Sequence, residues 1–364
     1  MLNTTRFRES QVTGNKMKHW TEPSGIFLLR IPIEWQYRNL AVADGREESP
    51  YSFEPYDEAI GCFQISCYPL AELAPNLKQG ASKTKLNGNW EHSRMDSQDF
   101  DVHLFFGAKD DQALIGKYIY SRTLRNDARV AEQLTIVREV LRSIVVVPPN
   151  ERNLAANLNK HDRFLASLVA SYDLLYSAIE SESYVEIIVL SANQIDAFLR
   201  LSIVLAKQLQ AESDDIDVKY LFQGDGEKGL LERVVFNHAR ELGVIDEATR
   251  EELSDLYDFR NRIVHRYVIS SLKTRDMIPV VTKYLEMSER IRLVLRGFEE
   301  QQVGKNFGIY GHGFVRAESF DDMEIRRVHS WANDKHMLAR FKRKVEEGKP
   351  NTAQLLLGPL SDWF

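Results

Sequence analysis

Hydrophobic positions in the first part of the chain alternate with polar ones, as in β-strands that bury one face. The predicted strands cover residues 26–32, 59–69, 101–108 and 113–122. Residues 130–147 then place apolar side chains at helical intervals, up to Pro148-Pro149. We therefore expect a sheet domain over residues 20–147 that is closed by one helix.

Beyond Pro149 the hydrophobic period changes from that of strands to that of helices. Residues 148–160 are polar and predict a linker. The predicted helices cover residues 164–180, 184–209, 228–243, 246–269 and 277–300. The second is apolar on most of its circumference, which is typical of the central helix of a bundle. The sequence therefore predicts an α+β protein, with an antiparallel-sheet α/β sandwich followed by an all-α bundle over residues 161–300.

The two ends of the chain carry weaker patterns. Residues 1–19 form an N-terminal extension without the apolar stretch of a signal peptide. Residues 301–364 form a C-terminal extension, with a helix predicted over 327–347. No apolar run reaches the roughly 20 residues that span a bilayer. We therefore expect a cytoplasmic protein with no membrane partner.

Composition and charge limit the classes of function. The chain has 53 acidic and 47 basic residues and a net charge of −6, which argues against a protein that coats nucleic acid indiscriminately. Any RNA or DNA chemistry must therefore come from a small site. Cys62 and Cys67 are the only cysteines, and their odd offset in one strand points them to opposite faces. A disulfide framework and a thiolate metal site are both excluded.

The helix predicted over 246–269 carries an arginine where packing would favour an apolar residue. At about 100° per residue, Arg260 lies near the middle of its apolar arc. That arc contains Leu253, Leu256, Tyr257, Ile263, Val264, Tyr267 and Val268. A charge in this position is costly without a partner.

A row of polar side chains borders this apolar arc. The row consists of Ser254, Asp258, Asn261 and His265. Arg260 and His265 lie roughly 140° apart around the helix axis, so they do not converge on one small ligand within a single helix. The spacing therefore favours a composite site, in which a second copy of the helix supplies the opposite group.

The segment from Arg260 through Asn261 to His265 matches the R-N-x-x-x-H form of the R-x4-6-H motif, and Tyr267 extends it to R-x4-H-x-Y. With the surrounding bundle, residues 160–297 resemble the HEPN domain superfamily. The resemblance implies a metal-independent endoribonuclease that acts as a homodimer on RNA. The form with Tyr two residues after His resembles toxins of HEPN/nucleotidyltransferase pairs, which implies a toxin or defence effector controlled by an antitoxin or a modifying nucleotidyltransferase.

Each residue of the motif suits a step of RNA cleavage without a metal ion. The imidazole of His265 exchanges its proton near neutral pH and can act as general base or acid. Arg260 offers a bidentate fork to the phosphate oxygens, and Asn261 can hold the His265 ring or bond the phosphate. Asp258 can orient a neighbouring group of the motif, but its role is only a supporting one because its carboxylate would repel the phosphate. Tyr267 either lies at the interface between the two copies or is the residue that is modified.

Further basic residues are candidate RNA contacts. They are Arg262, Arg266, Arg340, Lys342, Arg343 and Lys344. His329 and His336 share one face of the last predicted helix, but their spacing is not that of a zinc site and no cysteine is near. We therefore expect no metal and no cofactor.

The order of strands, long loop, strands and helix over residues 20–147 resembles the PsbP-like α/β sandwich. That fold is used mostly for binding, so the resemblance implies a binding or sensing domain. A second interpretation of the whole chain stays open. In it, the HEPN bundle is catalytically inactive and serves dimerisation and partner docking, the N-terminal domain is the binding surface, and Arg260 and His265 are structural.

Overall fold

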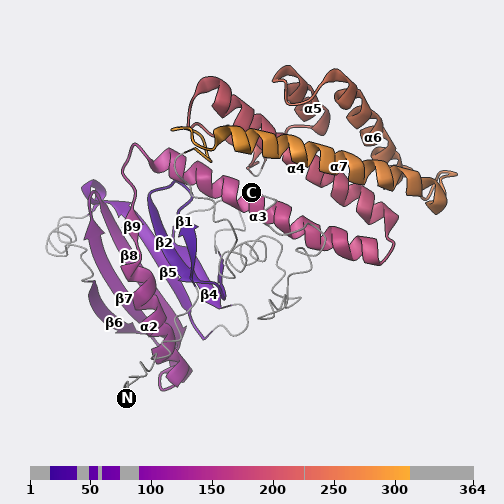
Figure 1. Cartoon of the computed structure of the whole chain (residues 1–364). Helices are drawn as coiled ribbons and strands as arrows, with labels where there is room; N and C mark the ends of the chain where they lie inside the picture. Colours follow the sequence, from indigo (N-terminus) through magenta and orange to yellow (C-terminus); the bar gives the residue numbers. More distant parts are fainter. Residues whose placement is uncertain (1–16, 39–48, 56–59, 74–89, 225, 312–364) are drawn as a thin grey trace, which may run out of the picture.

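The computed structural model joins an N-terminal antiparallel sheet region to a helical region (Figure 1). This mixed α+β architecture confirms the predicted class. The residues that the structure describes are 17–38, 49–55, 60–73, 90–224 and 226–311. The helix predicted over 327–347 lies outside them, as do Arg340, Lys342, Arg343 and Lys344.

The sheet region contains two antiparallel sheets. The smaller sheet has the order β1-β2-β9, and the larger one has the order β3-β4-β5-β8-β7-β6. The strands of the smaller sheet are β1 (Met17–Thr21), β2 (Phe27–Pro32) and β9 (Val145–Val146). Those of the larger sheet are β3 (Trp35–Tyr37), β4 (Tyr51–Pro55), β5 (Cys62–Pro69), β6 (Glu91–Asp96), β7 (Phe100–Lys109) and β8 (Gln112–Ser121).

The core of this region combines an aromatic cluster with one helix. Trp20 of β1 contacts rings of three other strands, with centroids 5.1 Å from Tyr51 and Phe53 of β4, 5.4 Å from Tyr37 of β3 and 5.9 Å from Phe27 of β2. Helix α2 (Ala128–Arg142) covers the sheets with buried side chains that include Val137. Burial of these side chains from both sheets and the helix holds the region together.

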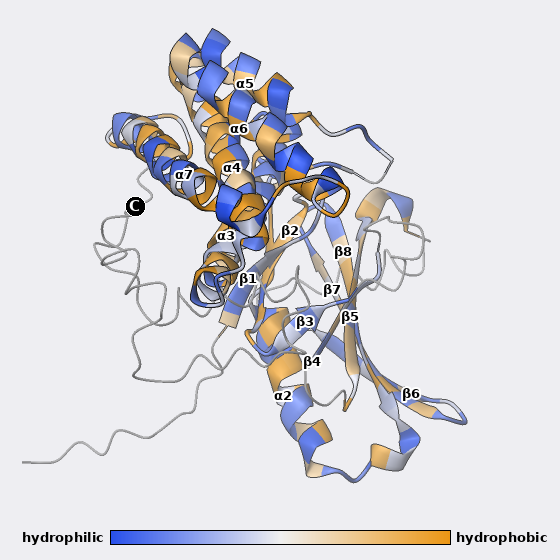
Figure 2. Ribbon diagram, turned by 90° about the vertical axis from the view of Figure 1, so that its right-hand side faces the viewer, coloured by the Kyte–Doolittle hydropathy of each residue, from blue (hydrophilic) through white to orange (hydrophobic). Residues whose placement is uncertain are grey.

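The helical region is built around α4. Its helices are α3 (Arg152–Glu180), α4 (Tyr184–Ala211), α5 (Glu232–Glu241), α6 (Glu247–Arg266) and α7 (Thr274–Gln302). Helix α4 contacts each of the other four, and Figure 2 shows its hydrophobic positions among them. The predicted central role of this helix is confirmed. Helix α4 is also long and apolar enough to cross a membrane, but 67% of its most apolar window is buried inside the molecule.

Several predicted boundaries in the sheet region are wrong. The extension predicted over residues 1–19 already contains the start of β1, which pairs with β2. The helix predicted over 130–147 ends at Arg142, because Val145 and Val146 pair with β2 instead. Short strands and the polar strand β6 give no alternating signal, so the sequence did not predict them.

The predicted linker is also largely helical. Helix α3 begins at Arg152, within the range 148–160, and buries Ala156 and Asn157. Its first residue is tied to the sheet region, since the Arg152 guanidinium donates to Asp111 at 2.9 Å and to the Val147 carbonyl at 3.0 Å. The polar composition that suggested a linker therefore belongs to a helix that joins the two regions.

Gly25, in the turn between β1 and β2, allows this close approach. It has a φ of 76°, and a Cβ added there would lie 1.9 Å from the Arg152 carbonyl oxygen. We expect Gly25→Ala to lower the free energy of unfolding by about 2–5 kcal/mol, from backbone strain and displacement of α3.

Gly243 provides the matched control, measured by urea unfolding. It has a φ of 71°, and an added Cβ would meet no described atom within 4 Å. Gly243→Ala therefore reports backbone strain alone, about 1–2 kcal/mol. Equal losses in the two variants would show that the contact with α3 contributes nothing.

A polar network around the buried Asp101 and His103 joins β6, β7 and β8. Asp101 is fully buried and accepts hydrogen bonds from Arg125 at 2.6 and 2.7 Å and from Arg94 at 3.0 Å. These bonds, those of Arg125 first, hold the pKa of Asp101 well below its usual range. His103 lies beside them, with its ring nitrogens 2.9 Å from His92 Nε2 and 3.3 Å from the Tyr120 hydroxyl. Burial, followed by the effect of His92, lowers the pKa of His103 to about 4.

This network predicts a pH dependence of stability. An unfolded histidine has a pKa of about 6.5, so the unfolded chain binds a proton at His103 more readily than the folded chain does. Stability should therefore fall as the pH decreases from about 6.5 to about 4. Urea unfolding at pH 7 and 4.5 should show a smaller difference for His103→Gln than for the wild type. Asp101 does not obscure this window, because its contribution is lost only below the unfolded value of about 3.9. An equal pH difference in both proteins would contradict the prediction.

The chain after α7 folds back against α4. The Gln302 side chain donates to Gln208 Oε1 at 3.0 Å, and the Gly308 amide donates to Asp214 Oδ1 at 2.8 Å. Residues 303–311 are turns and bends, and Gly308 has a φ of 83°. The first part of the C-terminal extension therefore caps the end of α4.

Candidate functional site

Helix α6 positions the whole R-x4-H-x-Y segment. Asp246 caps its N-terminus, since its Oδ1 accepts from the Thr249 amide at 2.8 Å. Leu253, Leu256 and Ile263 are its buried residues and fix its rotation against the bundle. Arg260 is therefore directed toward the interior, and the polar row toward the border of the buried face.

Arg260 has the partner that its position requires. Its guanidinium donates to both carboxylate oxygens of Glu232 in α5, at 2.9 and 3.2 Å. The Arg260 and Glu232 side chains are 15% and 21% exposed, so the pair is largely removed from water. The guanidinium also lies 5.0 Å from the centre of the Tyr257 ring. This bidentate pair binds α6 to α5.

A second ion pair lies next to the first. The Arg200 guanidinium donates to Asp196 at 2.6 Å and to the Leu230 carbonyl at 2.8 Å. Burial raises the pKa of Asp196 and of Glu232, while Arg200 and Arg260 oppose these shifts. Two carboxylates and two guanidiniums thus balance one another between α4, α5 and α6.

This cluster is not fully satisfied. Asp196 Oδ1 and Arg260 Nε are buried and have no hydrogen-bond partner among the described residues. Unpaired buried polar atoms cost free energy. The cluster therefore holds one free acceptor and one free donor. It was not predicted from the sequence, because Glu232 and Asp196 lie far from Arg260 along the chain.

His265 occupies a different position from Arg260. It lies in the last turn of α6 and is exposed to solvent. Within the described part of the chain it makes no hydrogen bond or ion pair, and none joins it to Arg260. The predicted separation of the two side chains around α6 therefore holds in the structure, and a single chain does not bring them together.

The supporting residues have varied surroundings. Asp258 forms an ion pair with Arg233 of α5. The Tyr267 hydroxyl is hydrogen-bonded to the Thr274 hydroxyl at 3.0 Å. The Arg262 guanidinium lies 5.0 Å from the centre of the Phe259 ring. Asn261 is half-buried, and Arg266 is exposed. Asp258 and Tyr267 therefore have structural partners within the chain.

Three apolar residues close to His265 in the sequence, one in the last turn of α6 and two just after it, are exposed. Val264 is 48% exposed, Val268 93% and Ile269 82%. Ile278, near the start of α7, is also exposed. Three neighbouring apolar side chains in solvent are unusual for a helix end. We call Val264, Val268 and Ile269 the α6 apolar patch.

We next consider the side chains that could bind a metal ion and the two cysteine thiols. No cluster of three or more His, Cys, Asp or Glu side chains that could hold a metal ion occurs in this part of the chain. Both cysteines are free thiols. Burial raises the pKa of Cys62 and raises that of Cys67 to about 12, which keeps both thiols protonated and weakly reactive.

The chain matches no protein-family model and no curated protein. A crystal structure of a protein from Bacteroides thetaiotaomicron aligns with 54% of this chain and 79% of its own length, at 13% sequence identity and a TM-score of 0.30. A likeness this slight carries no argument about fold or function.

Proposed function

We propose that the helical region is a HEPN-type endoribonuclease that cleaves RNA without a metal ion, at a site formed by two copies of the chain. The observation that carries the proposal is the exposed His265 beside the α6 apolar patch. Burial of this patch against a second copy would bring two His265 rings toward one symmetric seam. The N-terminal region, in this proposal a PsbP-like sandwich, acts as the binding or sensing part.

Two copies of His265 can divide the proton transfers of the reaction. One imidazole takes the proton from the ribose 2′-hydroxyl, whose oxygen then attacks the phosphorus atom. The bond from phosphorus to the 5′-oxygen breaks, and the second imidazole gives that oxygen a proton. The products are a 2′,3′-cyclic phosphate end and a 5′-hydroxyl end.

Arg260 requires an exchange of partners in this mechanism. Its fork holds the Glu232 carboxylate, and a phosphate presents similar paired oxygens to a guanidinium. RNA binding would therefore replace Glu232 by the scissile phosphate, with Asn261 beside it. As a toxin or defence effector in the cytoplasm, the protein would be controlled by an antitoxin or by a nucleotidyltransferase that modifies Tyr267.

The test is incubation of the purified protein with total cellular RNA in excess EDTA. Cleavage that leaves 2′,3′-cyclic phosphate ends is the expected result, because the mechanism uses side chains alone. Cleavage that stops on chelation, or that leaves 3′-hydroxyl ends, would contradict the proposal. Absence of cleavage across protein concentrations at which the dimer forms would also contradict it.

The α6 apolar patch predicts the oligomeric state. Val268→Asp combined with Ile269→Asp should shift the protein from dimer to monomer and abolish cleavage, because two buried charges would oppose association. Leu293→Asp is the control, since Leu293 of α7 is also exposed. Analytical ultracentrifugation measures the outcome. A dimer that persists in the double variant would place the interface elsewhere.

A second candidate function is a catalytically inactive HEPN bundle that dimerises and docks partners. The bidentate pair of Arg260 with Glu232 favours it, because that pair occupies the arginine that cleavage requires. Arg260 is then structural. His265, which this interpretation of the sequence also expected to be structural, is exposed and makes no hydrogen bond among the described residues. Intact RNA in the EDTA experiment, together with a stable dimer, would select this function.

A further inference from the structure

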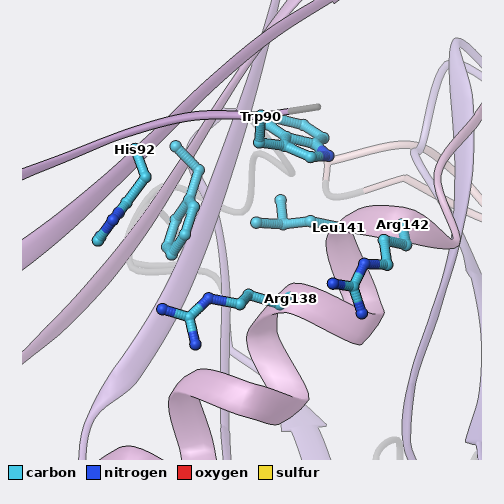
Figure 3. Close-up of a pocket in the computed structure, with 6 residues that line it drawn as sticks. Trp90, His92, Arg138, Leu141 and Arg142 are labelled. Carbon is cyan, nitrogen blue, oxygen red and sulfur yellow. The ribbon is translucent and has the colours of Figure 1, made fainter. Parts of the chain in front are cut away.

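A small pocket opens between the edge of the larger sheet and α2, far along the chain from α6. It has a volume of about 160 Å³ and is lined by Trp90, His92, Phe105, Arg138, Leu141 and Arg142. Figure 3 shows Trp90 and His92 on the sheet side and Arg138, Leu141 and Arg142 on α2. The pocket therefore has one aromatic wall and one cationic wall.

The cationic wall consists of Arg138 and Arg142, which lie one helical turn apart on α2. Neither guanidinium has an ion pair or hydrogen bond within the described residues. By contrast, Arg129 of the same helix is paired with Asp127 at 2.7 Å. Two neighbouring, unpaired guanidiniums repel each other, and an anion held between them would relieve the repulsion.

The opposite wall carries no carboxylate, since the lining side chains include neither Asp nor Glu. Trp90 contributes its indole ring to this wall, while its Nε1 is buried. The positive charge of the two guanidiniums is therefore not balanced by an acidic side chain in the lining of the pocket.

His92 completes the aromatic wall as a neutral ring. It stacks on Phe105 with ring centroids 4.9 Å apart, and its Nε2 lies 2.9 Å from His103 Nδ1. Burial, and then the nearby Arg138, lower the pKa of His92. The positive charge of the pocket therefore comes from the two arginines, and the flat surfaces of Trp90, His92 and Phe105 favour a flat group.

We infer that this pocket binds a small aromatic anion, in which a carboxylate or phosphate group is attached to a single ring. The anionic oxygens pair with Arg138 and Arg142, and the ring lies beside Trp90 and His92, above a floor formed by the buried Phe105 and Leu141. The volume of about 160 Å³ fits one ring with its anionic group and is below the roughly 300–1,000 Å³ of pockets for larger ligands. The inference does not depend on ribonuclease activity.

Isothermal titration calorimetry of the full chain with four probes tests the inference. Phenyl phosphate and benzoate carry a ring and an anion, inorganic phosphate lacks the ring, and benzylamine has the ring with a positive charge. We expect saturable binding of phenyl phosphate or benzoate, weaker binding of inorganic phosphate and none of benzylamine. The stronger of the first two probes identifies the anion. The indole N–H signal of Trp90 in NMR spectra, assigned with Trp90→Phe, should shift during the same titration.

Matched variants separate the pocket from general surface charge. Arg138→Gln combined with Arg142→Gln should weaken binding at least about tenfold, because charge-assisted hydrogen bonds are lost. Arg129→Gln removes the same charge from the same helix outside the pocket and should leave the affinity unchanged. Circular dichroism confirms that each variant is folded.

Several results would overturn the inference. Binding of benzylamine as tight as that of phenyl phosphate would show that charge plays no part. An unchanged affinity in the double arginine variant, or an equal loss in Arg129→Gln, would place the site elsewhere. Absence of binding by both phenyl phosphate and benzoate would show that the pocket does not take this class of ligand.

Discussion

Replacing His265 by alanine is expected to reduce RNA cleavage by about 100- to 10,000-fold, the usual contribution of a positioned general acid or base. The side chain is exposed and makes no hydrogen bond among the described residues. Its removal should therefore leave the thermal unfolding temperature and the proposed dimer unchanged. The measurement is the initial cleavage rate on a defined RNA in EDTA, together with a thermal melt.

A matched histidine in the same bundle serves as the control. His238 of α5 has its Nδ1 3.0 Å from the Tyr220 hydroxyl and lies outside the motif. His238→Ala should keep the cleavage rate within a few-fold of the wild type, although it loses this hydrogen bond. If His265→Ala cleaves RNA as fast as His238→Ala, His265 has no part in the chemistry.

Replacing Glu232 by glutamine is expected to lower the free energy of unfolding by about 2–4 kcal/mol. The change leaves the Arg260 charge largely buried without its carboxylate. The expected loss is somewhat below the roughly 3–5 kcal/mol of a fully buried pair, because both side chains keep some exposure. Urea unfolding measures the difference.

Two further variants show whether the loss belongs to the buried pair. Glu247→Gln removes a carboxylate that is 53% exposed and pairs with Arg250 and, at 3.4 Å, with Arg240, so it should cost at most about 1 kcal/mol. Arg260→Met combined with Glu232→Leu should recover most of the stability lost in Glu232→Gln, since no unpaired charge remains. Equal losses in Glu232→Gln and Glu247→Gln would mean that the pair is not held out of water.

Glu232→Gln and Arg260→Gln together distinguish the two proposed functions. Glu232→Gln keeps the guanidinium of Arg260, so a ribonuclease should keep its cleavage at temperatures where this variant is folded. Arg260→Gln should lose cleavage at the same temperatures. If both variants lose only stability, Arg260 is structural, and the docking function gains support.

The sequence predicted those elements whose burial pattern is regular. The long strands β7 and β8 alternate between buried and half-buried positions, and α4 is apolar around most of its surface. Strand β6 could not be predicted, because each of its residues is exposed and polar residues dominate it. Its position is set by pairing with β7, which is a tertiary interaction.

In the candidate site, too, the tertiary interactions could not be predicted from the sequence. Helical geometry was enough to separate Arg260 from His265 and to require a partner for the buried guanidinium. It did not identify Glu232, because a pairing between two helices depends on how they pack. The exposure of Val268 and Ile269 could not be predicted either, because an apolar residue at the end of a helix cannot be distinguished by sequence from a residue of the core.

The continuity of α3 gives the molecule a mechanical connection between its two regions. Its 29 residues span about 44 Å at 1.5 Å per residue, from the contacts at Gly25 and Asp111 to the packing against α4. A flexible tether would absorb a change in the sheet region. A rigid rod transmits it, so a tilt of about 5° at the first turn moves the far end by about 4 Å. Helix α3 can thus act as a lever through which a displacement in the sheet region reaches the packing of the bundle.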